Sequence, residues 1–223
     1  MKKVIMFLLL AMIMASTSVV FTSCSSSDDD EPKVETYQLK LKVGETCDYK
    51  DLEGLISENE FVASVNGTQI KALHVGKTVI HSSNAIINAE VYSQYNLFDE
   101  PFIKFGGSKN DVKNYEKRTL EKETDTELYY KSTGAFEYGL VYGFTDNGKL
   151  NTVLMMFNHN YDTTISSNLA KYFSDRYLAL SISGNESYFL NNEKGKADVA
   201  IVVDLFVPNY NGWGQIAYMP YNN

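Results

Sequence analysis

The segment richest in binding chemistry combines flat aromatic rings with asparagine and glycine near the C-terminus. Residues 209–214 read Asn-Tyr-Asn-Gly-Trp-Gly, and Tyr218 and Tyr221 follow closely. Aromatic rings bury a large area with few rotatable bonds, so they stack on sugar faces or anchor protein contacts. We therefore predict Tyr210, Trp213, Tyr218 and Tyr221 as ligand-binding residues. The sequence leaves open a second interpretation, in which the segment is a hairpin turn and its tryptophan folds back onto the sheet.

The other residues with catalytic or metal-binding potential do not form the pattern of a known site. His74 and His81 lie an odd number of positions apart, so on one continuous strand they would face opposite sides. His159 lies in a polar loop where Asp162 is the one nearby carboxylate, whereas a calcium loop needs several. None of the 28 carboxylates forms an evident pair for glycoside hydrolysis. We expect no enzyme activity, no catalytic residue, no metal and no cofactor.

Cys24 is a candidate for covalent modification because of the residues on both sides of it. Two lysines precede a mostly apolar stretch over residues 4–21, and a threonine and a serine come directly before the cysteine. A basic start, an apolar core and small residues at the cut are typical of a secretory signal. With the cysteine at the cut and a polar tether behind it, the segment resembles a bacterial lipoprotein signal. The Ser-Asp-Asp-Asp-Glu run over residues 27–31 resembles the export signal of Bacteroidetes-type surface lipoproteins.

This resemblance implies that residues 1–23 are removed and that Cys24 carries lipid chains. More than one acyl chain gives stable anchoring, so we expect a lipid-anchored protein of the outer membrane, exposed at the cell surface. The acidic segment 24–34 cannot bury apolar surface and is predicted to be a disordered tether. The alternative is a retained helix, because the apolar stretch is about long enough to span a bilayer. The Ser-Thr-Ser at residues 16–18 argues against it.

The charge argues against one class of partner, and the cysteine content argues against an internal disulfide. The formal net charge is −8, and removal of residues 1–23 takes away two lysines and no acids, which gives −8 − 2 = −10. Lysine and arginine form no basic stripe, so we expect no nucleic-acid partner. Cys47 is the second of the two cysteines, and with Cys24 acylated no internal disulfide can form. We interpret Cys47 as a small core residue.

Residues 35–98 are predicted to form a small all-β domain. Apolar residues alternate with polar ones from Tyr37 to Val43, which is typical of a strand with one buried face. Asn66-Gly67 predicts a tight hairpin that returns into residues 69–72.

A set of positions in this domain follows a family pattern: Leu41–Glu45, Ser57–Val65, Gly67, Ile70, Ala72, residues 75–78 and Ile80. These residues resemble a bacterial Ig-like domain of group 2 in a truncated form. The resemblance implies a spacer or an adhesion module without catalytic residues.

Residues 99–223 are predicted to form a second domain, of the α+β class. Ser108 and Asp111 form a capping-box pattern for a helix over about 109–122, and apolar residues from Ile165 to Leu180 recur at helical spacing. Three strands are expected after each helix: 128–130, 138–144 and 150–157, then 187–190, 199–207 and 215–218. We therefore expect two helices on one face of an antiparallel sheet, with an internal α-β-β-β duplication.

Two short motifs carry a family likeness in this domain. Gly107-Ser108 with Asp111-Val112 opens a helix, and residues 142–150 read as an aromatic strand, a turn and a returning strand. They resemble small envelope domains related to the beta-lactamase inhibitor protein and to outer-membrane assembly lipoproteins of the small-protein-A kind. The domain is also similar to the C-terminal halves of uncharacterised gut-bacterial lipoproteins. Such a likeness implies a fold and transfers no active site.

Together these features predict a non-catalytic cell-surface lipoprotein that acts in binding or adhesion, with a glycan, another envelope protein or a host protein as partner. Two other classes stay open. One is an inhibitor or outer-membrane assembly factor that works by protein contact through the open face of the sheet. The other is a hydrolase with an unrecognised site.

Overall fold

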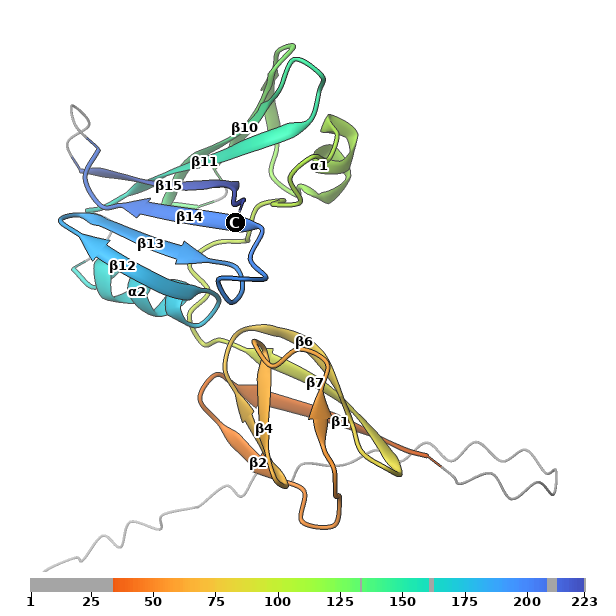
Figure 1. Cartoon of the computed structure of the whole chain (residues 1–223). Helices are drawn as coiled ribbons and strands as arrows, with labels where there is room; N and C mark the ends of the chain where they lie inside the picture. The colour runs from red at the N-terminus through yellow and green to blue at the C-terminus, as the bar shows by residue number, and fades with distance from the viewer. Residues whose placement is uncertain (1–33, 133, 161–162, 208–211, 223) are drawn as a thin grey trace, which may run out of the picture.

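The structure is a computed structural model that describes residues 34–132, 134–160, 163–207 and 212–222. Cys24, the predicted signal and most of the tether lie outside the described residues, as does Tyr210. Figure 1 shows two parts, and each has its own cluster of buried apolar side chains.

The first part consists of two small sheets. Its strands are β1 (Glu35–Lys42), β2 (Thr46–Asp48), β3 (Ile56–Ser57), β4 (Ala63–Asn66), β5 (Gln69–Ala72), β6 (Gly76–His81) and β7 (Ala85–Tyr92). One sheet has the order β1-β7-β6-β3, in which β1 and β7 run parallel, and the other has the order β2-β5-β4. The predicted tight hairpin into residues 69–72 is confirmed, but its two turn residues are Gly67 and Thr68, because Asn66 pairs with Gln69; Gly67 has a φ of 61°. The Ig-like assignment stays a prediction.

The second part is a single large sheet with two short helices. In chain order its elements are α1 (Lys109–Tyr115), β8 (Leu120–Glu123), β9 (Glu127–Lys131), β10 (Glu137–Phe144), β11 (Leu150–Asn158), α2 (Ile165–Ser174), β12 (Leu178–Ser183), β13 (Glu186–Leu190), β14 (Val199–Asp204) and β15 (Trp213–Pro220). The eight strands have the order β12-β13-β14-β15-β11-β10-β9-β8, and every pairing is antiparallel. Strands β11 and β15 therefore join the two halves at the centre.

The α+β prediction for this part is wrong, because strands make up 47% of the described residues and the two short helices 9%. The first helix ends at Tyr115 and not near residue 122, since its apolar face is thin and only Val112 is buried. Glu116 is already extended, and residues 120–123 form β8. The second helix ends at Ser174, and Leu178–Ser183 forms β12 because Leu178, Leu180 and Ile182 follow a period of two.

The expected α-β-β-β unit is also wrong in its strand count, because four strands follow each helix. The expected arrangement of the helices does not hold either. The ten-residue α2 lies beneath β12 and β13, whereas α1 lies beside the far end of β10 and β11 (Figure 1). The capping box at Ser108 is confirmed, since Ser108 and Asp111 bond reciprocally through side chain and backbone.

The inner face of the large sheet is covered partly by α2 and partly by an irregular segment, residues 95–105. Phe98 lies at the centre of this layer, 4.4 Å from the Tyr172 ring and 5.8 Å from the Phe136 ring, between centroids. The predicted division between residues 98 and 99 lies inside this segment. The irregular segment therefore supplies core packing that the short helices leave open.

Direct hydrogen bonds link the two parts of the chain. The backbone N–H of Val75 donates to the carbonyl oxygen of Asp175 at 2.8 Å, and the Ser93 hydroxyl donates to the Asp175 carboxylate at 2.6 Å. Lys171 also places its ammonium group 5.0 Å from the Tyr95 ring centroid. The C-terminal end of α2 is thus the region of the large domain that contacts the small one.

Candidate functional site

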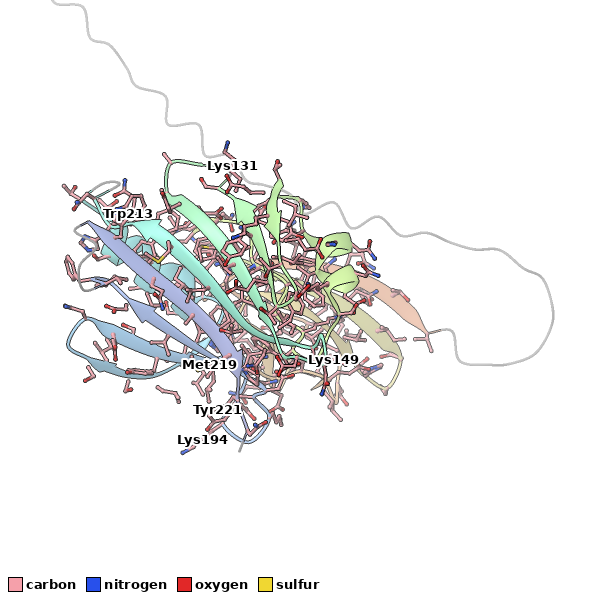
Figure 2. The ribbon with its side chains drawn as sticks, turned by 90° about the horizontal axis from the view of Figure 1, so that it is seen from above. Lys131, Lys149, Lys194, Trp213, Met219 and Tyr221 are labelled. Carbon is pink, nitrogen blue, oxygen red and sulfur yellow. The ribbon has the colours of Figure 1, made fainter. Side chains whose placement is uncertain are left out.

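The two faces of the large sheet differ in how they are covered. Successive side chains of a strand point to opposite faces, and β11 shows this in one step: Met155 is fully buried, whereas Met156 is partly exposed. We call the face on which Met156 lies the outer face. Its partly exposed apolar side chains are Tyr129, Val141, Leu154, Met156, Tyr188, Val202, Trp213 and Ala217. Figure 2 looks onto the sheet from this side, with Trp213 and Met219 at opposite ends of β15.

The strand register places six of these side chains in one continuous line across the sheet. Each residue is the direct cross-strand partner of the next: Tyr129, Val141, Leu154, Ala217, Val202 and Tyr188. Neighbouring strands lie about 4.8 Å apart, so the five intervals span about 24 Å. In the part of the chain that the structure describes, no helix packs on this line. The outer face is therefore a broad apolar surface and not a pocket.

A tyrosine closes each end of this line, and each is held in the same way. The Tyr129 hydroxyl donates to the Glu127 carboxylate, and the Tyr188 hydroxyl donates to the Glu186 carboxylate. In both cases the hydrogen bond to the carboxylate is the main cause that raises the pKa of the phenol. Both phenol hydroxyl groups therefore stay protonated at neutral pH.

Charge is distributed unevenly over the outer face. Lys122 and Lys131 lie on β8 and β9, and the Lys122 ammonium group is 5.2 Å from the Tyr129 ring centroid. At the other side Glu186 and Asp204 face each other across β13 and β14, and strands β12 to β14 contain no lysine or arginine. A partner with positive charge over β13 and β14 would therefore be favoured electrostatically.

Trp213 lies at one end of the outer face, where β15 begins. Its ring centroid is 4.6 Å from that of Tyr138, in an edge-to-face contact, and Tyr138 is 67% exposed. Sequence reasoning missed Tyr138, because it joins Trp213 only through the sheet, in which Trp213 pairs with Asn158 on β11. The two rings together form an aromatic pair at the edge of the outer face.

The other predicted binding residues do not join this pair. Tyr218 is fully buried on the inner face, where burial strongly raises the pKa of its phenol. Tyr221 follows the far end of β15, and its backbone N–H donates to the carbonyl oxygen of Asp198. Tyr210 lies outside the described residues. The structure therefore places Trp213 and Tyr218 on opposite faces, and Trp213 and Tyr221 at opposite ends of one strand (Figure 2).

A buried ion cluster under the sheet was also missed from the sequence. The Arg118 guanidinium group donates to Glu137 at 2.7 Å and to Glu116 at 2.7 Å, and the Tyr142 hydroxyl donates to Glu116 at 2.6 Å. Burial by itself lowers the pKa of Arg118, but the hydrogen bonds and charges of Glu137 and Glu116 outweigh it and raise the pKa. Because these groups bond to one another inside the core, the cluster holds the fold and offers no open site.

The histidines and the free cysteine lie apart from one another. His74 stacks on Phe61 at 3.9 Å between centroids, and His81 pairs with Glu58 at 2.7 Å. Burial raises the pKa of the Cys47 thiol, which makes the thiolate scarcer at neutral pH. Within the described ranges, no group of three or more histidine, cysteine or acidic side chains is arranged to hold a metal ion.

Two further findings bear on function. Among the helices of the described residues, none combines the length and the apolar character needed to cross a membrane. A comparison of the chain with models of known protein families and with the curated proteins finds no match to either.

Proposed function

We propose that this chain is a non-catalytic, lipid-anchored surface protein that binds a partner protein through the outer face of its eight-stranded sheet. The lipid anchor rests on the sequence around Cys24, and the binding role rests on the outer face. The observation that carries the proposal is the unbroken apolar line from Tyr129 to Tyr188, which no described helix covers. Large apolar patches on a protein surface mark interaction sites.

The shape of the face favours a protein over a small molecule. Its line of side chains is about 24 Å long, which matches the dimensions of a protein interface better than those of a ligand pocket. Tyrosine rings at both ends provide rigid contacts of the kind that carry binding energy in interfaces. The length of the line and its aromatic ends therefore support a protein partner.

The charge of the face defines the partner further. Glu186 and Asp204 form an acidic side over β13 and β14, and the chain without residues 1–23 carries −8 − 2 = −10. Complementary charge steers association and suppresses wrong partners. The partner we propose has an apolar surface that covers the line, with basic side chains along one side of it that lie against Glu186 and Asp204.

A photo-cross-linking residue at Ala217, at the centre of the line, tests this proposal in the full chain on its native cell. We expect one cross-linked product of defined mass. Val202→Glu should abolish it, because Val202 is the direct neighbour of Ala217 on β14 and a carboxylate there would be desolvated by the partner. The matched control is Ile86→Glu, at an equally half-buried position of β7 in the small domain.

The control variant should leave the cross-linked product unchanged, and both variants should retain the wild-type melting temperature within a few degrees. A product that survives Val202→Glu would contradict the proposal. So would the absence of any product from Ala217.

The exposed aromatic pair supports a second candidate, carbohydrate binding at the edge of the outer face. Tyr138 leaves most of its ring open to solvent beside Trp213, and such rings can stack on sugar faces. Glycan binding should then be lost in Trp213→Ala and Tyr138→Ala while the fold survives, and it should be retained in Val202→Glu. If Trp213→Ala unfolds the domain, the aromatic pair is part of the core and this candidate fails.

A further inference from the structure

The two edges of the large sheet differ sharply in chemistry. Strand β8 at one edge reads Leu-Glu-Lys-Glu, and its Glu123 pairs with Lys113 at 2.6 Å. Strand β12 at the other edge reads Leu-Ala-Leu-Ser-Ile-Ser, without a charged residue (Figure 1). Charged side chains protect an edge strand from pairing with another chain, and β12 lacks this protection.

Strand β12 also exposes large apolar side chains. Ile182 is 81% exposed, the highest value among the exposed large apolar residues of the described chain, and Leu180 is 47% exposed. Leu180 is the extra residue of a bulge, so regular pairing with β13 is confined to each side of it. The regular stretch that remains toward the hairpin is Ser181–Ser183.

The backbone of Ile182 points away from the sheet. Gly184 and Asn185 form a two-residue turn between the paired residues Ser183 and Glu186. Such a turn is closed by a hydrogen-bonded pair, and along an antiparallel ladder the next residue directs its N–H and C=O to the opposite side. Because β12 is the last strand of the sheet, no strand of the described residues lies on that side.

We propose that two copies of this chain pair through β12, antiparallel and centred on Ile182. The sequence around this residue is symmetric, Ser-Ile-Ser, so a two-fold axis places Ile182 against its own copy and Ser181 against Ser183 of that copy. Each Ile182 donates its N–H to the carbonyl of the other. The two apolar side chains then cover each other, which removes from water the most exposed large apolar side chain of the described residues.

Charge explains why a second copy fits this edge. Without residues 1–23 each chain carries −8 − 2 = −10, so two copies repel one another, and their contact is least unfavourable where no acidic side chain lies. Strand β12 itself has no acidic side chain, and Glu186 lies one strand further from the contact, on β13, whereas β8 would place glutamates of both copies together. The two-fold axis is perpendicular to the sheet, so both outer faces point the same way and a dimer presents two binding faces.

Cysteine cross-linking in intact cells tests the pairing in the full chain. Opposed residues of a hydrogen-bonded antiparallel pair have Cα atoms about 5.5 Å apart, within the range that a disulfide spans. In a Cys47→Ser background, Ile182→Cys should give a dimer under mild oxidation that reductant removes. The matched control is Glu121→Cys on the charged edge strand β8, which should stay monomeric.

A second pair of variants distinguishes specific pairing from a cross-link formed by chance collision. Ile182→Lys should shift the detergent-extracted full chain from dimer to monomer in light scattering, with an unchanged melting temperature because the side chain is exposed. Glu121→Lys should leave the dimer intact. Val202→Glu on the outer face should also leave it intact, which separates this pairing from the proposed partner binding.

The pairing is overturned if Ile182→Cys gives no more dimer than Glu121→Cys, or if Ile182→Lys remains dimeric. A light-scattering mass larger than that of a dimer would also overturn it, because an isologous two-fold contact closes on itself.

Discussion

Tyrosine occurs on both faces of the large sheet, but its burial differs between them. Tyr142, Tyr172 and Tyr218 on the inner side are fully buried, whereas Tyr129 and Tyr188 lie in the line across the outer face. The helix α2 and residues 95–105 close the inner face, and no described element closes the outer one. The difference shows that a high tyrosine content does not by itself mark a binding site. Strand register decides which rings are available.

The largest loss of unfolding free energy is expected from a substitution in the buried ion cluster of the inner face. Arg118→Ala leaves Glu116 and Glu137 buried without their cation, which costs about 3–5 kcal/mol of unfolding free energy. Lys40→Ala is the control, because Lys40 pairs with Glu90 on the surface and should cost under about 1 kcal/mol. Urea denaturation measures both. Equal costs would mean that the cluster does not hold the inner face.

A neighbouring pair of methionines compares the two faces within one strand. Met155→Ala opens a cavity in the core and should cost about 2–5 kcal/mol. Met156→Ala removes a partly exposed side chain from the outer face and should cost under about 1 kcal/mol. Thermal unfolding of the two variants checks the difference. A larger cost for Met156→Ala would mean that the outer face is part of a core.

Two buried hydroxyl groups of the inner face should respond differently to removal. Tyr142→Phe loses the hydrogen bond to Glu116 and the one from the Phe102 N–H, and should cost about 1–3 kcal/mol. The Tyr218 hydroxyl is buried without a hydrogen-bond partner among the described residues. Tyr218→Phe should therefore be neutral or stabilising by up to about 1 kcal/mol.

Chemical denaturation of these two variants gives the comparison. If Tyr218→Phe destabilises the protein as much as Tyr142→Phe does, the Tyr218 hydroxyl has a partner that the described residues do not show.

Local patterns predicted the local features of the fold. The Asn66-Gly67 hairpin follows from turn chemistry, and the Ser108 capping box follows from spacing along the chain. The strands β10 and β11 and the turn between them, at residues 145–149, were readable from alternation and Gly148. Each of these features depends on residues that are close in sequence.

Features that depend on distant residues were not predictable in the same way. The predicted helix lengths were wrong because the residues of β8 and β12 also fit a helical period. Pairing with neighbouring strands decides whether such residues form a helix or a strand. The contact of Tyr138 with Trp213 depends on the register between β11 and β15. Parity alone would have separated Trp213 from Tyr218, since five positions along one strand reverse the face.

Oxidative footprinting of Met155 and Met156 tests the central claim, that a partner covers the outer face, most directly. Hydroxyl radicals oxidise exposed methionine faster than buried methionine. The full chain is labelled after purification and on its native cell. Met155 should stay unmodified in both, and Tyr115, which is 50% exposed and lies away from the sheet face, should be labelled in both. We expect oxidation of Met156 in the purified chain and protection on the cell. Equal oxidation of Met156 in the two samples would contradict the account.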